Sequence, residues 1–371
     1  MSVNSRTSVL VCRIMGRRSL TDDPHPYGSR NMSFGFERTC ILLVAILCSG
    51  CGESQQGPLG GESQASALAP FRLALNWYPE TEHGGFIAAD VEGFYTEAGL
   101  AAEIIPGGPG APQAVIAELA AGRIQFAVSS ADNVIRAREA GVPVVALLAA
   151  LQQSPRCIMV HKAAGFQSLH DLKDVELSMS EARPFALWMK KKLPLEGVTI
   201  VPFNGLVGEF LLKPNFAQQA YVFSEPFIAR EQGGDPQSLM VAEIGFNPYS
   251  SLLVTTESVI EMQEDLVRKV VAAAQQGWKK YLELPDDTNR QIQKLNEEMS
   301  AEALAYGAEA MKPLCLVPEG TAFGQMTESR WAELISQIEE LGEIPADSVA
   351  AAECFSNKFL PVENADRPAA P

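Results

Sequence analysis

The sequence predicts an α/β fold of two lobes, each a mostly parallel sheet flanked by helices, followed by a helical C-terminal tail. Apolar, strand-like segments alternate with amphipathic segments from residue 71 onward, shorter units of the same kind follow His161, and only helical patterns follow Glu261. Of the 371 residues, 47% are hydrophobic and 20% are charged, so the chain can bury the cores of two domains and does not have a disordered composition.

The first lobe is predicted from four strands and the helices between them. The strands are residues 71–75, 101–105, 124–128 and 144–151. The helices are 86–94, 112–120 and 131–140, each with an apolar face and with a glycine at or near its end. The repeated strand–helix order predicts a parallel sheet that is covered by helices.

The second lobe is predicted from shorter units, and the chain then returns to the first. Strands are expected over 171–178, 198–202 and 219–223, with a helix over 185–192. The apolar segment 252–255 crosses back, and helices that include 295–310 and 330–341 form a tail that we expect to pack on the first lobe. We therefore assign residues 71–158 and 252–360 to lobe 1, 159–251 to lobe 2, and 361–371 to a disordered tail.

The N-terminal region predicts export. Residues 40–48 are an uncharged apolar run behind Arg38, too short for a membrane span and typical of a signal peptide over 32–50. Met32 is the expected start, with 1–31 a misassigned leader. Small residues precede Cys51 as in a bacterial lipobox, so we expect lipidation at Cys51, the alternative being a signal peptide without a lipid. Residues 51–70 have the composition of a flexible tether.

Charge and cysteine content exclude several functions. Residues 1–50 hold six arginines and three acids, so the remaining 321 residues carry 23 basic and 42 acidic groups, a net charge of −19. Such a field repels nucleic acid and argues against polybasic docking on a membrane. Cys157, Cys315 and Cys354 show no metal-ligand spacing, so no metal and no cofactor is expected; whether Cys315 pairs with Cys354 stays open.

A set of short motifs resembles the type II periplasmic binding proteins of the thiamine-pyrimidine-precursor and sulfonate/nitrate/taurine group. In chain order they are LNWYP (75–79), HGGF (83–86), GFYTEAGL (93–100), IIPGG (104–108), FAVSSAD (126–132), GVPV (141–144), SP (154–155), LHDLK (169–173) and SEP (224–226). The resemblance implies an extracytoplasmic receptor that closes two lobes around a small molecule and delivers it to the permease of an ABC importer. We expect it to be a monomer.

In open α/β sheets, ligands bind beyond the carboxyl ends of the strands. Three residues follow the first predicted strand, and two serines follow the third: Asn76, Trp77, Tyr78, Ser129 and Ser130. The aromatic pair offers faces for a planar ring, and hydroxyls with helix N-terminal amides offer hydrogen-bond donors. Alternatively, the tryptophan packs in the core and one of the serines caps a helix.

The resemblance adds further candidates. His83 begins the first helix and is expected to contact the ligand or to be structural. Glu225 matches the family position that pairs with amino groups of an aminopyrimidine-like ring, and two parallel N–H bonds to one carboxylate give both energy and orientation. Alternatively, Glu225 is a solvated loop acid. Arg183 either faces an acidic ligand group or lies on the surface. Ser154 belongs to a matching motif, and Tyr249 lies near the return crossover, where it is expected to close the cleft.

Two functions are weighed. The favoured one is a solute-binding lipoprotein without catalysis that takes a hydroxymethyl- or formylamino-pyrimidine precursor of thiamine, with riboflavin, sulfonate, nitrate or taurine as alternative ligands. The other is an enzyme, because the fold includes pyrimidine synthases that consume their own histidine, at the position of His83. The export signal and the lack of a cysteine-rich iron motif argue against the enzyme.

Overall fold

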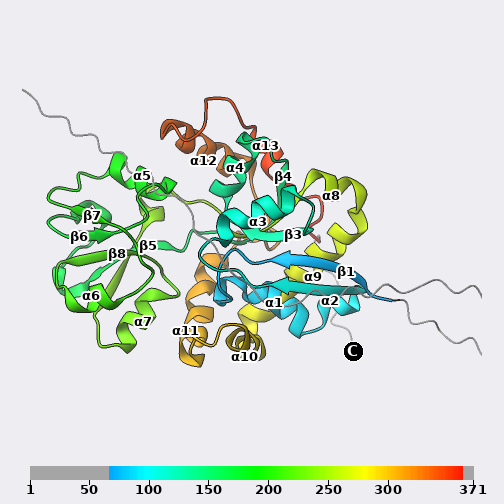
Figure 1. The fold of residues 1–371 in the computed structure, drawn as a ribbon, viewed down its shortest axis with the longest axis horizontal. Helices are drawn as coiled ribbons and strands as arrows, with labels where there is room; N and C mark the ends of the chain where they lie inside the picture. The colour runs from blue at the N-terminus through cyan, green and yellow to red at the C-terminus, as the bar shows by residue number, and fades with distance from the viewer. Residues whose placement is uncertain (1–66, 362–371) are drawn as a thin grey trace, which may run out of the picture. The chain divides into compact units, whose positions relative to one another are not determined.

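The computed structural model describes residues 67–361, which form two five-stranded sheets (Figure 1). The first sheet has the order β2 (Leu100–Ile105), β1 (Ala69–Ala74), β3 (Phe126–Ser129), β10 (Ser250–Thr256) and β4 (Val144–Leu151). The second has the order β7 (Thr199–Val201), β6 (Glu176–Ser178), β8 (Phe216–Tyr221), β5 (Arg156–His161) and β9 (Pro236–Met240). The predicted fold class is confirmed.

One strand in each sheet runs against the other four. β10 is antiparallel to β3 and β4, and β5 is antiparallel to β8 and β9, whereas the remaining pairs are parallel. Each reversed strand arrives from the other sheet, β5 through residues 152–155 and β10 through residues 241–249. The expected lobe boundary at 158 falls inside β5, which pairs with strands of the second sheet. We propose that the lobes divide at these two crossovers.

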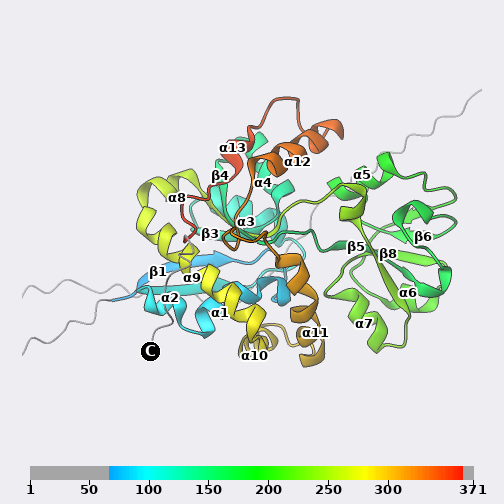
Figure 2. The same cartoon turned by 180° about the vertical axis from the view of Figure 1, so that it is seen from behind.

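Helices cover both faces of the first sheet (Figures 1 and 2). One face carries α1 (Gly84–Val91), α2 (Phe94–Glu97), α9 (Glu264–Glu283) and α10 (Asp286–Leu295). The other carries α3 (Ala111–Ala120), α4 (Ala131–Glu139), α12 (Glu328–Glu340) and α13 (Ala351–Cys354). The remaining helices are α5 (Pro184–Lys192), α6 (Gly208–Leu212) and α7 (Glu225–Glu231) beside the second sheet, α8 (Glu257–Met262) after β10, and α11 (Ala301–Met311).

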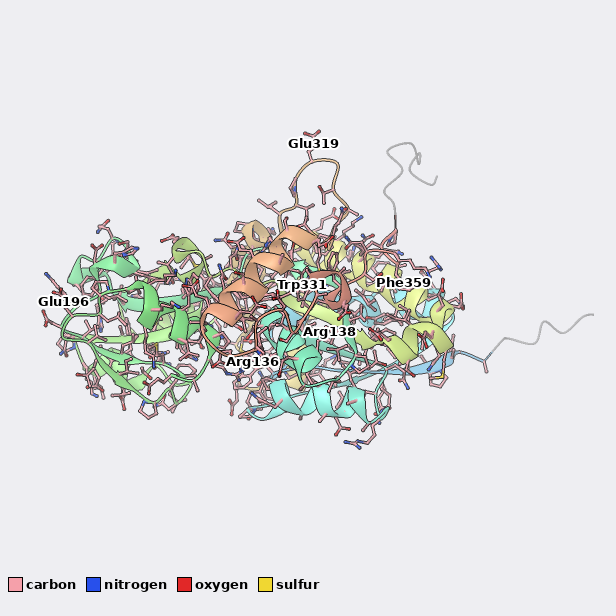
Figure 3. All side chains as sticks on the ribbon, turned by 90° about the horizontal axis from the view of Figure 1, so that it is seen from above. Arg136, Arg138, Glu196, Glu319, Trp331 and Phe359 are labelled. Carbon is pink, nitrogen blue, oxygen red and sulfur yellow. The ribbon has the colours of Figure 1, made fainter. Side chains whose placement is uncertain are left out.

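The C-terminal helices pack on the first sheet, as the sequence predicts. The backbones of α1 and α9 approach so closely that a Cβ atom on Gly277 would lie only 2.2 Å from the carbonyl oxygen of Gly85. On the opposite face, Arg136 of α4 forms an ion pair with Glu343, and Trp331 of α12 stacks on Phe355 at 6.0 Å; Arg136 and Trp331 are labelled in Figure 3. The tail is therefore part of the first lobe's core.

Three predicted boundaries are wrong, each for a local reason. The strand expected over 171–178 is shorter, because a 3₁₀ turn at Leu169–Asp171 precedes β6. The strand expected over 219–223 begins and ends earlier, as β8. The helix expected over 295–310 begins later, as α11, since α10 ends at Leu295 and the Ser300 hydroxyl accepts the N–H of Ala303 to begin α11.

The predictions on export concern residues outside the described range. The leader (1–31), the signal peptide (32–50), Cys51 and nearly all of the tether and tail lie there. Within residues 67–361, no helix is both long and apolar enough to cross a membrane. In the same range no cluster of side chains could hold a metal ion, and the three cysteines are buried and free, so Cys315 and Cys354 are not joined.

Candidate functional site

Several predicted site residues lie in loops at the carboxyl ends of strands from both sheets. Residues 75–83 follow β1, residues 130–132 follow β3, and residues 222–225 follow β8. The side-chain hydroxyl of Ser224, after β8, donates to the carboxylate of Glu80, after β1. The two sheets therefore meet at the edge where open α/β folds bind their ligands.

Asn76 and His83 are joined by a hydrogen bond, and the imidazole of His83 is fully buried. Its Nδ1 accepts the backbone N–H of Glu80 at 3.3 Å, and its Nε2 lies 2.9 Å from Oδ1 of Asn76. Burial lowers the pKa of His83 to about 3, so the ring is neutral at physiological pH. Both ring nitrogens are engaged within the protein, whereas Asn76 is half-buried.

Trp77 and Tyr78 keep accessible aromatic surface beside this pair. Trp77 is half-buried, Tyr78 is 46% exposed, and the two rings meet edge to face at 5.6 Å. Gly107 lets the neighbouring loop approach, because a Cβ atom there would lie 2.3 Å from the carbonyl oxygen of Leu75. Neither aromatic ring belongs to the core in this structure, so both remain candidates for stacking on a planar ligand.

Three carboxyl groups, which we call the acidic cluster, lie together: Glu80, Glu82 and Glu225. Glu80 and Glu82 are 7% and 3% exposed. The pKa of Glu80 is raised well above 4.5, mainly by burial and also by the charges of Glu82 and Glu225. Burial likewise raises the pKa of Glu82 to about 7 and that of Glu225 above its usual range. The cluster therefore keeps protons at pH values at which exposed carboxyls are ionised, and its oxygens can take part in hydrogen bonds.

Glu225 is held by the turn at the start of α7. Its carboxylate accepts the backbone N–H of Tyr221 at 2.8 Å, and this bond opposes the rise in its pKa. Glu225 as a whole residue is half-buried. Its proposed contact with a ligand stays a prediction, and the structure places it beside acids of the other sheet.

Arg156, at the start of β5, is the cation that faces the acidic cluster. Its charge lowers the pKa of all three carboxyls, against the effect of burial. The guanidinium lies over the ring of Tyr221 at 4.1 Å and over that of Phe185 at 4.9 Å. Burial is the main cause that raises the pKa of Tyr221 to about 12, and the charge of Asp132, at the start of α4, contributes. Arg156 and Tyr221 thus belong to the same site.

The two serines after β3 have different surroundings. The Ser130 hydroxyl donates to Oδ1 of Asp132 at 2.6 Å and accepts from Asn133 at 3.1 Å, so it is used at the start of α4. The Ser129 hydroxyl is 1% exposed and has no hydrogen-bond partner among the described residues. Ser129 is therefore the serine whose hydroxyl is left for another partner.

Ser154 and Tyr249 lie in the crossovers rather than in the acidic cluster. The N–H of Ser154 donates to Oδ1 of Asn247 at 2.8 Å, and the hydroxyl of the buried Tyr249 accepts the N–H of Thr327 at 3.1 Å. Arg330 of α12 lies 3.8 Å from the centre of the Tyr249 ring. The Ser154 bond therefore joins the two crossovers to each other, and Tyr249 ties the second crossover to the C-terminal tail.

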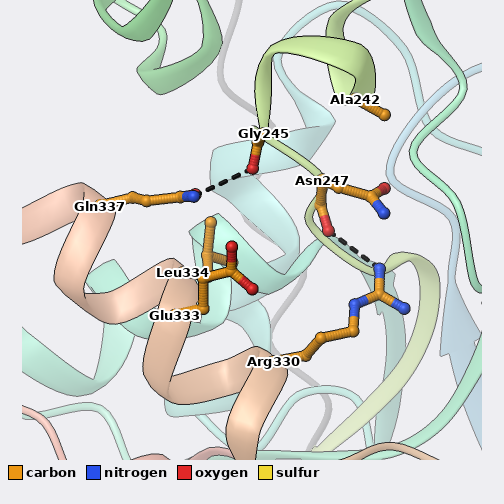
Figure 4. A pocket seen from close by; sticks show the side chains of 7 residues that line it. All are labelled: Ala242, Gly245, Asn247, Arg330, Glu333, Leu334 and Gln337. Carbon is orange, nitrogen blue, oxygen red and sulfur yellow. Dashed lines mark hydrogen bonds between the residues drawn. The ribbon is translucent and has the colours of Figure 1, made fainter.

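Arg330 connects the two crossovers directly. Its guanidinium donates to the carbonyl oxygens of Gln152 at 2.6 Å and Asn247 at 2.9 Å, and Figure 4 shows the second bond. Gln337, on the same helix, donates to the carbonyl oxygen of Gly245 at 2.9 Å (Figure 4). A pocket of about 250 Å³ opens here, and its lining residues are Ala242, Gly245, Asn247, Arg330, Glu333, Leu334 and Gln337.

Some site residues escaped the sequence analysis, and one predicted residue stands apart. Glu80 and Glu82 flank Thr81 between two matching motifs, 75–79 and 83–86, and Arg156 follows the Ser-Pro motif. These neighbouring motifs were the available signal. Arg183 is half-buried at the start of α5, two residues before Phe185, and no described residue hydrogen-bonds its side chain.

The sequence pattern of the family described as NMT1/THI5 like matches residues 80–288, more than half of the chain. The chain belongs to the NMT1/THI5-like family. The predicted group is thereby confirmed. A formylaminopyrimidine-binding protein of Halalkalibacterium halodurans is 24% identical to this NMT1/THI5-like chain over 321 residues, 82% of this chain and 93% of that protein.

Two further comparisons bear on the NMT1/THI5-like chain. A 4-amino-5-hydroxymethyl-2-methylpyrimidine phosphate synthase of Legionella pneumophila is 28% identical over 110 residues, 30% of this chain and 34% of that protein. The solved structure of the periplasmic aliphatic sulphonate binding protein SsuA of Escherichia coli matches with a TM-score of 0.59 at 13% identity, over 76% of this chain and 91% of that one. This structural likeness confirms the periplasmic-binding-protein fold.

Proposed function

We propose that the protein is an extracytoplasmic solute-binding lipoprotein of an ABC importer and that it binds a planar heterocycle with amino groups, such as a thiamine pyrimidine precursor. The observation that carries the proposal is the acidic cluster, contributed by both sheets beside the accessible rings of Trp77 and Tyr78. Carboxylates accept hydrogen bonds from amino groups, and the rings stack on a planar heterocycle.

Charge supports a heterocycle over a sulfonate or nitrate. Three carboxyls and one guanidinium face the same space, so an anion would be repelled by each ionised carboxyl and would bind only with further protonation of the acidic cluster. An N–H-bearing ring would instead stabilise the ionised carboxylates. The relative from Halalkalibacterium halodurans, a formylaminopyrimidine-binding protein, agrees with this ligand class.

The family and the fold support the proposal of delivery to a permease, and export with lipidation at Cys51 is proposed from the sequence alone. Mass spectrometry of the mature N-terminus is expected to find a lipid on Cys51. A plain amine at that residue, or a cut elsewhere, would refute the anchor.

Ligand extraction followed by a thermal-shift screen tests the binding proposal. The expected result is stabilisation by a hydroxymethyl- or formylamino-pyrimidine, growing with ligand concentration as binding linkage requires. Riboflavin and an alkanesulfonate are the comparison ligands. Stabilisation by the alkanesulfonate with no response to any pyrimidine would overturn the proposal.

The partial similarity to a phosphate synthase favours a test of catalysis as well. In this structure the imidazole of His83 is fully buried and both of its nitrogens are hydrogen-bonded, so no free nitrogen is available to a substrate. Purified protein incubated with iron and pyridoxal phosphate is expected to form no pyrimidine. Formation of one, with loss of intact His83 in a peptide digest, would establish the enzyme instead.

A further inference from the structure

The protonation of His83 follows from its partners. The backbone N–H of Glu80 can only donate, so Nδ1 of His83, at 3.3 Å, must accept and carries no proton. In a neutral imidazole the other nitrogen then holds the proton. Nε2 therefore donates, and the nearest acceptor is Oδ1 of Asn76 at 2.9 Å.

This bond fixes which end of the Asn76 amide faces the histidine. An asparagine amide has an acceptor oxygen and a donor nitrogen, and only the oxygen can receive a bond from Nε2–H. The amide nitrogen Nδ2 is therefore turned away from the ring, and none of the hydrogen bonds formed among residues 67–361 uses it. Asn76 is half-buried beside the accessible Trp77, so its two N–H groups can meet a solute.

An acceptor lies next to these donors. Oε1 of Glu82 is 3.5 Å from the same Nε2 atom, so the Asn76 amide and the Glu82 carboxylate are neighbours around one ring nitrogen. A donor and an acceptor side by side complement a ligand edge on which a ring nitrogen adjoins an amino group. Many aminopyrimidines have such an edge, and a sulfonate, which only accepts, does not.

We propose that Asn76 is a specificity-determining residue that donates to an acceptor atom of the ligand, and that His83 is the positioning residue that holds its amide in this orientation. The inference rests on the proposed function, since it concerns the same site. His83 touches no ligand in this arrangement and acts through Asn76. His83 therefore affects the selectivity of the protein between ligands that differ in one acceptor atom.

The first test needs no ligand. Long-range ¹H–¹⁵N NMR of the imidazole nitrogens in the ligand-free protein is expected to show His83 protonated at Nε2 only. A proton on Nδ1, or on both nitrogens at neutral pH, would overturn the positioning role whatever the protein binds.

The second test compares 4-amino-5-hydroxymethyl-2-methylpyrimidine with its two analogues in which one ring nitrogen is replaced by CH, by calorimetry. The wild-type protein is expected to prefer the pyrimidine over one analogue by roughly tenfold, the effect of one net hydrogen bond. In His83→Leu this ratio should fall to about twofold or less, and in His83→Gln, whose amide can donate to Asn76, most of it should return.

The variant Asn76→Asp distinguishes the loss of the Asn76 hydrogen-bond donors from misfolding around the buried His83. Aspartate keeps an oxygen for the bond from Nε2–H but has no N–H donors, so the fold should persist while the preference for the ring nitrogen disappears. An unchanged ratio in both His83→Leu and Asn76→Asp would refute the inference and leave the proposed function intact. Failure of the wild-type protein to bind any of the three compounds would instead refute the proposed function and with it the ligand role of Asn76.

Discussion

Replacing Glu82 by glutamine should stabilise the protein at neutral and alkaline pH and reduce the pH dependence of its stability. The Glu82 side chain is buried, and desolvation raises its pKa from 4.5 to about 7, against the opposing charge of Arg156. Between these pH values the folded protein holds a proton that the unfolded chain has released. The contribution of this group to stability is therefore fully present below pH 4.5 and is lost as the pH rises through 7.

The stability of the wild-type protein that is lost over this pH range is about 3 kcal/mol, because the pKa rises from 4.5 to about 7 and each pKa unit corresponds to about 1.36 kcal/mol. Glutamine has nearly the same shape as glutamate and no charge. The difference in the free energy of unfolding between Glu82→Gln and the wild type should therefore be about 3 kcal/mol larger, in favour of the variant, at about pH 8 than at about pH 4. Urea unfolding followed by circular dichroism measures this difference.

The exposed Glu261 on α8 provides the matched control, because Glu261→Gln removes the same charge without a buried environment. Its difference from the wild type should stay within about 0.5 kcal/mol at both pH values. If Glu82→Gln and the wild type differ by the same amount at both pH values, Glu82 is not a buried acid with a raised pKa, and the electrostatic argument for the acidic cluster fails.

Three further predictions concern binding and the connection between the sheets. Glu225→Gln should weaken pyrimidine binding by about 1.5 to 3 kcal/mol, the range for a hydrogen bond to a charged group, and an unchanged dissociation constant by calorimetry would remove Glu225 from the site. Gly307→Ala should weaken binding with little loss of stability if the lobes separate to relieve the clash. The new Cβ would lie 2.7 Å from the Thr81 side chain and 3.1 Å from the carbonyl oxygen of Phe223, and these two residues follow strands of different sheets. Small-angle scattering should show a more open molecule, and an unaltered scattering curve with unaltered affinity would contradict this. Arg330→Met should cost about 2 to 3 kcal/mol in urea unfolding, since it removes two bonds from a charged donor to backbone carbonyls, and a loss below about 0.5 kcal/mol would show that the crossovers do not depend on it.

The sequence predicts those elements whose signal is local. The continuous apolar run of β4 (Val144–Leu151) and the helix at Pro184–Lys192 were predicted closely, because hydrophobic pattern and end signals coincide there. β5 was missed, since its apolar residues lie between two polar ends without alternation. Its pairing with β8 and β9 depends on residues about 60 to 80 positions away, which no local window contains.

The same limit applies to the candidate site. Asn76 and Trp77 could be found because they end a strand within a matching motif. Glu80 and Glu82 look like solvated loop acids in the sequence, and they are buried by distant segments that include Ser224 after β8, Ser251 of β10 and helix α11. Likewise, the role of His83 depends on the two partners that its ring nitrogens meet, and this information is three-dimensional.

The reversed strand β10 has a consequence for the order in which the protein folds. β10 lies between β3 and β4, so β4 has no place in the first sheet until Ser250–Thr256 has been synthesised, after the whole of the second sheet. Non-local pairing of this kind slows folding. A nascent chain would therefore keep its first sheet incomplete until most of the chain has been synthesised.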